Sequence, residues 1–124
     1  MDIAFASTGE FFILMDNQIV ILNEKGEFVK AINCPKGIFQ GMIHSDNDEI
    51  FVSCFDDNKA TLYSYDVVSD DLKKKTDIVG DGRIMCKYKE SQILCFDSHE
   101  IVAVDTNDGT KLVLQFLPYC FNLY

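Results

Sequence analysis

Short apolar runs separated by polar breaks recur three times along the chain, in the same order each time. Each recurrence has an apolar run ending at an aspartate, a polar break, a second apolar run, a polar turn and a third, alternating run. The segments cover residues 10–32, 49–78 and 91–116. Their aspartates are Asp16, Asp56 and Asp97, by subtraction 40 and 41 positions apart. This spacing is close to the roughly 40–45 residues of a four-stranded propeller blade.

The runs predict strands rather than helices, because they are short, rich in Ile, Val, Phe and Tyr, and bounded by Asp, Asn, Gly and Ser. In the first run Phe12 and Leu14 would share one face. The aspartate spacing matches them to four further apolar residues, Val52, Cys54, Ile93 and Cys95. Strands that are apolar on both faces are typical of a strand between two layers. The third runs alternate, as outer strands with one wet face do.

A short inner strand is predicted before each segment, at residues 3–5, 41–43 and 83–86. Tight hairpin turns are predicted at Asn23–Gly26 and Asn107–Gly109, where glycine supplies a positive φ. Residues 67–75, the best helical candidate, are broken by Ser69-Asp70-Asp71 and are expected to form an extended hairpin loop. The sequence therefore predicts an all-β domain of about twelve short strands.

Residues 2–32, DIAFASTGEFFILMDNQIVILNEKGEFVKAI, resemble a β-propeller blade, most closely the NHL type. The resemblance implies a single domain, 1–124, built of three four-stranded antiparallel blades. These would span about residues 1–32, 33–78 and 79–116, followed by an aromatic C-terminal tail, 117–124. Propellers typically have about four to eight blades, so three would be incomplete. The chain could dimerise into six blades, complete a partner's propeller, pack without a closed ring, or be a fragment of a longer protein.

Composition narrows the function classes. The 124 residues carry 20 Asp+Glu against 11 Lys+Arg, a formal charge of −9, which argues against direct nucleic-acid binding. No apolar run reaches the roughly 18 residues of a membrane helix, and the start lacks the basic residues of a secretory signal. The five cysteines show no C-x-x-C spacing, and Cys54 and Cys95, which sit inside apolar runs, are expected to be buried thiols. We therefore expect a protein of the reducing cytosol or nucleus, without membrane association.

The chain offers few groups for catalysis. His44 and His99 are the only histidines, and neither has a metal-ligand partner at a suitable spacing. No phosphate-binding glycine motif is present, and DTNDGT at residues 105–110 is expected to form an Asx-turn rather than a calcium site. We predict no catalytic residues, no metal, no cofactor and no enzymatic activity.

The predicted function is a non-enzymatic protein–protein interaction module that docks on a partner, a larger assembly or a second copy. Binding would use an open blade edge, acidic rim loops and the aromatic tail, with strand addition at segments 49–55 and 112–124. The tail would dock on the domain or insert into a partner. The expected contact residues are Phe51, Phe55, Asp56, Asp57, Leu117, Tyr119, Phe121 and Tyr124. The alternative is an acidic inhibitor or mimic that blocks a basic, nucleic-acid-handling surface.

Overall fold

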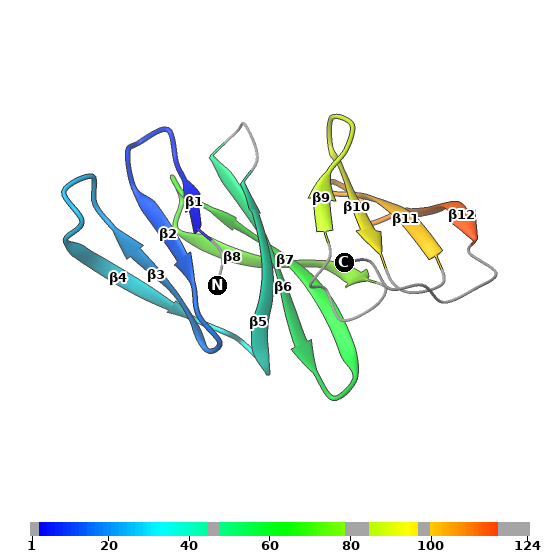
Figure 1. Cartoon of the computed structure of the whole chain (residues 1–124), viewed down its shortest axis with the longest axis horizontal. Coiled ribbons are helices and arrows are strands. Elements are labelled where there is room, and N and C mark those ends of the chain that lie inside the picture. The colour runs from blue at the N-terminus through cyan, green and yellow to red at the C-terminus, as the bar shows by residue number, and fades with distance from the viewer. Residues whose placement is uncertain (1–2, 45–47, 79–84, 97–99, 117–124) are drawn as a thin grey trace.

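Antiparallel strands make up almost all of the described chain (Figure 1). The structure, a computed structural model, describes residues 3–44, 48–78, 85–96 and 100–116. Within these ranges there is no helix, which confirms the all-β prediction. The twelve strands are β1 Ile3–Phe5, β2 Phe11–Leu14, β3 Gln18–Leu22, β4 Phe28–Asn33, β5 Ile38–His44, β6 Glu49–Asp56, β7 Lys59–Asp66, β8 Asp71–Ile78, β9 Met85–Lys87, β10 Gln92–Phe96, β11 Glu100–Asp105 and β12 Lys111–Phe116.

The strands form three four-stranded sheets in which each strand pairs with its neighbour in sequence. Sheet A is β1-β2-β3-β4, sheet B is β5-β6-β7-β8 and sheet C is β9-β10-β11-β12. Every pairing is antiparallel; the outermost pair of each sheet has one register shift, and the β5–β6 pair has another between Phe39 and Gly41. The predicted set of three blade-like sheets is confirmed.

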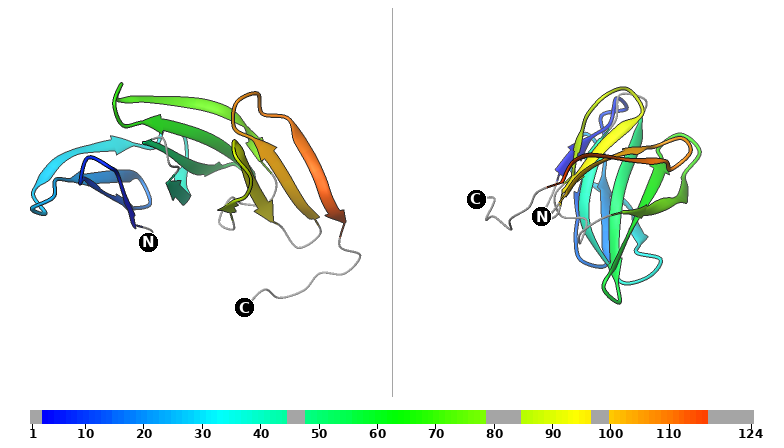
Figure 2. Two further views of the ribbon diagram at one scale, coloured as in Figure 1. Left: turned by 90° about the horizontal axis from the view of Figure 1, so that it is seen from above. Right: turned by 90° about the vertical axis from the view of Figure 1, so that its right-hand side faces the viewer.

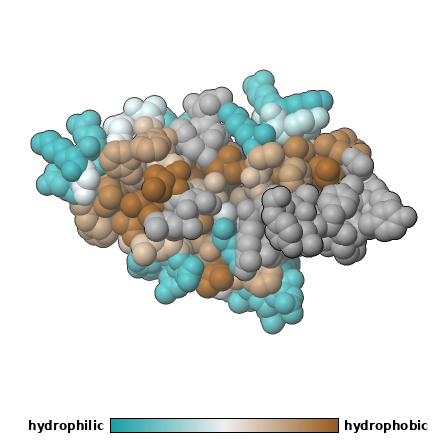
Figure 3. Space-filling view, viewed as in Figure 1, coloured by the Kyte–Doolittle hydropathy of each residue, from teal (hydrophilic) through white to brown (hydrophobic). Residues whose placement is uncertain are grey.

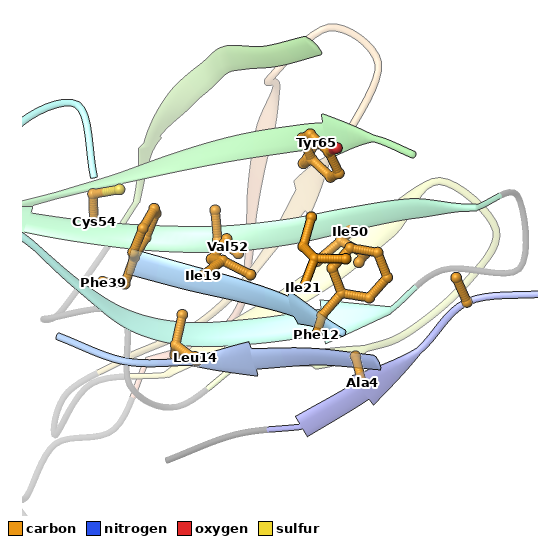
Figure 4. Packing of buried hydrophobic residues seen from close by; sticks show 11 residues of the cluster. Ala4, Phe12, Leu14, Ile19, Ile21, Phe39, Ile50, Val52, Cys54 and Tyr65 are labelled. Carbon is orange, nitrogen blue, oxygen red and sulfur yellow. The ribbon is translucent and has the colours of Figure 1, made fainter. Parts of the chain in front are cut away.

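The sheets pack face to face as three layers, with sheet B in the middle. One core cluster lies between sheets A and B, and Figure 4 shows side chains of β2, β3 and β6 meeting there, among them Phe12, Ile21 and Val52. A second cluster lies between sheets B and C and includes Leu62 and Ile93. Sheet B therefore buries both of its faces, as its doubly apolar strands predict.

The three layers fan into an arc rather than a flat stack (Figure 2). The first strands of the sheets, β1, β5 and β9, contact one another in turn on the concave side. The last strands, β4, β8 and β12, lie on the convex side, and sheets A and C lie at opposite ends of the arc. This is the arrangement of consecutive propeller blades around a central axis.

The strand registers of the three sheets repeat at a spacing of 41 residues, one residue away from the predicted match of Asp16 to Asp56. Asp57 and Asn58 form the β6–β7 turn with positive φ, and Asp56 still pairs with Lys59. In sheet A the turn residues are Asp16 and Asn17, because the amide of Met15 donates to the carbonyl of Gln18. Asp16 therefore corresponds to Asp57, not to Asp56. Asp97 lies outside the described residues.

This one-residue slip reverses the faces, since alternate strand residues point to opposite sides of a sheet. Phe12 and Leu14 of sheet A point toward sheet B, whereas Val52 and Cys54 of sheet B point back toward sheet A. The predicted equivalence of these two pairs was wrong. The true counterparts of Phe12 and Leu14 are Ser53 and Phe55, which lie on the side of sheet B that faces sheet C.

The predicted loop at residues 67–75 is also corrected, because β8 already begins at Asp71. The Asp66 carboxylate accepts the backbone N–H groups of Val68 and Ser69, and Asp70 adopts a positive φ. These local bonds close the hairpin over a few residues, so the lysine-rich segment that follows is strand. The inner strand β5 begins at Ile38, earlier than predicted, and residues 83–84 lie outside the described ranges.

Candidate interaction faces

The outward side of sheet A is an apolar surface that no other described sheet covers. Cross-strand pairing aligns Phe5, Phe11, Leu22 and Phe28 in one row and Ile3, Ile13, Val20 and Ala31 in the next. The side chains of Ile3, Phe5 and Phe28 are 60%, 59% and 67% exposed. The rings of Phe5 and Phe11 meet edge to face, with centroids 5.0 Å apart. We call these eight residues the A face.

The outward side of sheet C is a second apolar surface at the opposite end of the arc. Pairing aligns Cys86, Leu94, Ala103 and Leu112 in one row and Phe96 with Ile101 in the next. The side chain of Leu112 is 61% exposed, whereas Ala103 is buried. We call these six residues the C face. Asp105, which pairs with Gln92, is the next residue of β11 after Ala103 that points to this side, and it is charged.

The 41-residue spacing shows what the A face corresponds to in the other sheets. Ile13 matches Cys54 and Cys95, which are both buried against the preceding sheet. Val20 likewise matches Thr61 and Val102. The A face therefore presents the side that sheets B and C each bury against the sheet before them.

The C face presents the opposite side of the same contact. Ile101 matches Ala60 and Ile19, and both of these are buried against the following sheet. Ala103 matches Leu62 and Ile21, which are buried in the same way. The contact between neighbouring sheets forms twice within the chain, between A and B and between B and C. The A face and the C face correspond to the two sides of that contact.

Polar side chains fix sheet A on sheet B at the edge of their apolar contact. The Asp70 carboxylate accepts a hydrogen bond from the hydroxyl of Tyr65 at 2.6 Å and pairs with the ammonium of Lys30. Burial, followed by the bond to Asp70, raises the pKa of Tyr65. Hydrogen bonds from Lys30 and then Tyr65 lower the pKa of Asp70. Ser7 adds a further link by donating its hydroxyl to Asp48 at 2.6 Å.

The contact residues predicted from sequence are not brought together. Phe51 is only 4% exposed and lies in the core between sheets B and C, and Phe55 packs against the same core. Strand β6 pairs with β5 and β7, so segment 49–55 has no free edge for strand addition. Asp56 pairs with Lys36 at 3.6 Å, and Asp57 is exposed in the turn. The four tail residues lie outside the described residues; they are Leu117, Tyr119, Phe121 and Tyr124.

Hydrophilic residues lie above and below the apolar band that crosses the molecule in Figure 3, and several of the turns carry carboxylates. Most of the carboxylates there are engaged locally. Asp105 accepts the amides of Asn107 and Asp108, and Asp108 accepts the amide and hydroxyl of Thr110, which lowers the pKa of Asp108. This network confirms the predicted Asx-turn in residues 105–110.

A cavity of about 510 Å³ opens between the β9–β10 hairpin and the β5–β6 strands. Its lining mixes charged and neutral side chains, including Glu49, Lys87, Lys89 and Asn107. Among the described residues no three His, Cys, Asp or Glu side chains lie close enough to hold a metal ion. The same part of the chain contains no helix long and apolar enough to cross a membrane. His44 ends β5, and His99 lies outside the described ranges.

The search for relatives gives no family assignment. Neither a protein-family model nor a curated protein matches the chain.

Proposed function

We propose that the chain is a non-enzymatic protein–protein interaction module whose contact surfaces are the A face and the C face. The observation that carries the proposal is the A face itself, in which eight aligned positions are all apolar and no charged side chain interrupts the rows. Contiguous exposed apolar surface of this kind is costly in water and typically marks a binding site. The proposed contact surface is therefore the broad sides of the end sheets, whereas the sequence predicted strand edges and rim loops.

The blade geometry supports a propeller-type role for this module. Three face-to-face sheets with their first strands on the concave side form part of a ring, and another polypeptide would supply the missing layers. The glycine turns before β4 and β12 are features that the NHL-type blade shares, so we retain that type as our proposal for the repeat. Free thiols at the four described cysteines fit a reducing cytosol or nucleus.

The acidic-mimic alternative has weaker support. A mimic of a phosphate backbone needs carboxylates whose oxygens are free to meet basic residues. Here Asp70 is paired with Lys30 and Tyr65, and Asp66 caps its own turn. The carboxylates of Asp105 and Asp108 are engaged in the same local way. The acidic turns are better explained as rims that keep the assembly in solution.

Co-purification from the native cell tests the proposal. We expect Phe5→Glu, at the β1 end of a row of the A face, to abolish capture of the bound polypeptide. Val68→Glu is the matched control, since Val68 is 82% exposed in the β7–β8 turn and lies away from both faces. Binding through apolar faces should persist at high salt, because screening weakens charge pairs and not apolar contact. Capture that is insensitive to Phe5→Glu, or that is lost in salt, contradicts the proposal.

A further inference from the structure

We infer that the polypeptide that occupies both faces is a second copy of this chain, and that two copies close into a six-bladed ring. The A face of each copy packs on the C face of the other, so the same contact forms twice around a twofold axis. This inference rests on the proposed function and names its partner.

The first support is the equivalence of the end faces to contacts inside the chain. In the core between sheets A and B, Ile19 and Ile21 of sheet A lie on one side, and Val52 and Cys54 of sheet B lie on the other. At the ends of the arc the matching positions are Ile101 and Ala103 on the C face, and Phe11 and Ile13 on the A face. The C face of one copy can thus receive the A face of another in the way that sheet A receives sheet B.

The second support is the number of blades. The two end faces differ from each other, so the contact between copies is head-to-tail, and such contacts form closed rings when the rotation allows it. Propellers close with about four to eight blades, and two copies of this three-bladed chain give six. One copy gives too few blades and three copies too many. Two copies also leave no A face or C face uncovered.

The third support is the distribution of charge. A chain of net charge −9 resists self-association if its carboxylates meet at the contact. Neither the A face nor the C face contains a charged residue, and many of the described carboxylates lie at turns, among them Asp57, Asp70 and Asp108. Lateral packing of the end sheets therefore keeps the acidic rims in water. We expect added salt to leave the dimer intact or to strengthen it.

The test is the mass of the full chain in solution, by light scattering after size exclusion. We expect twice 14.1 kDa for the unchanged chain and 14.1 kDa for either Ile13→Lys on the A face or Ile101→Glu on the C face. Mixing the two variants should restore the dimer, because the mixed pair regains one unaltered contact and places Lys opposite Glu in the other. A pairing of A face with A face would instead be unaffected by Ile101→Glu, and that result overturns the inference.

Two checks keep the test decisive. Circular dichroism verifies that each variant keeps its β-sheet signal, and Leu112→Glu at an exposed C-face position replaces Ile101→Glu if it does not. Alkylation of Cys86, an exposed thiol on the C face, should be slow in the dimer and fast in the Ile13→Lys monomer.

The outcomes separate the inference from the proposed function. A monomer that captures another protein through Phe5 overturns the inference and leaves the proposed function standing. A monomer that dimerises only after residues 117–124 are removed also overturns it, because the tail would then be the occupant. A monomer whose binding does not depend on either face overturns both.

Discussion

The phenolic oxygen of Tyr65 lies 2.6 Å from Oδ1 of Asp70, and Lys30 of sheet A pairs with the same carboxylate. The Lys30 ammonium also lies over the Tyr65 ring, 5.7 Å from its centroid. Tyr65 thus helps to hold sheet A on sheet B, because its ring packs in the core between them and its hydroxyl bonds to Asp70 at the edge.

We expect Tyr65→Phe to lower the free energy of unfolding by about 1 kcal/mol, the net value of one such hydrogen bond. Urea denaturation measures the loss. Tyr88→Phe is the control, because the Tyr88 side chain is half exposed and outside both core clusters. Equal stability of the two variants would contradict the role given to the Tyr65 hydroxyl.

The Asp70 carboxylate should make stability fall in acid. Its pKa is lowered in the fold, so its stabilising contribution is complete above the ordinary pKa of 3.8 and is lost as the pH falls through the lower folded value. We expect Asp70→Asn to be less stable than the unchanged chain at neutral pH. Its stability should also decline less steeply below about pH 4. Parallel pH profiles for the two proteins would exclude a contribution from Asp70.

Phe12 is the largest fully buried side chain between sheets A and B. We expect Phe12→Ala to cost about 3–5 kcal/mol, because it removes a ring and leaves a cavity. Val68→Ala, at an exposed turn position, should change stability by less than about 0.5 kcal/mol. Denaturant titration with the two variants side by side checks both values, and a small cost for Phe12→Ala would argue against a packed A–B core.

Gly37 joins sheets A and B at a point where there is no space for a side chain. Its φ is +85°, and a Cβ there would lie 2.1 Å from the carbonyl oxygen of Phe55. We expect Gly37→Ala to cost about 2–5 kcal/mol, from the backbone conformation and the clash together. Gly26→Ala is the matched control, since φ is +82° but nothing lies within 4 Å. Its cost should be only about 1–2 kcal/mol, and thermal melts of the pair separate the clash from the backbone term.

The buried thiols should be unreactive and should set an alkaline limit to stability. Burial raises the pKa of Cys95 from 9.0 to about 12, and burial also raises the pKa of Cys54. Their contribution is therefore present below about pH 9 and is lost as the pH rises toward 12. We expect iodoacetamide to spare both thiols at pH 8 until urea unfolds the chain. Labelling of the native protein at Cys95, mapped by mass spectrometry, would contradict its burial.

The strand pattern was predictable because its signals are local. The turns at residues 23–26 and 107–109 form where glycine was expected, with φ of +82° at Gly26 and +76° at Gly109. The register between repeats was not predictable, because Asp56 and Asp57 are adjacent and either could correspond to Asp16. The pairing of Asp56 with Lys59 places Asp57 in the turn, and such a pairing between strands cannot be derived from the sequence pattern alone.

The candidate contact residues were harder to predict for a related reason. The apolar side chains of Phe11 and Ile13 indicate a strand covered on both sides, which is correct for sheet B but leaves sheet A with one side uncovered. Phe51 carries the same signal and is buried. Hydrophobicity alone cannot distinguish these cases, since the difference lies in whether a neighbouring layer exists in the same chain.

The arc formed by the three sheets has one more consequence for the proposed assembly. The sheets pack on one another through interior side chains such as Phe12 and Ile21, which lie in the core between sheets A and B and away from both end faces. The number of subunits in the ring is then a property of the folded protomer, while the end faces govern only how tightly the subunits hold. Repacking the interior would alter the number of blades that close a ring, whereas altering the end faces would alter only whether the subunits associate.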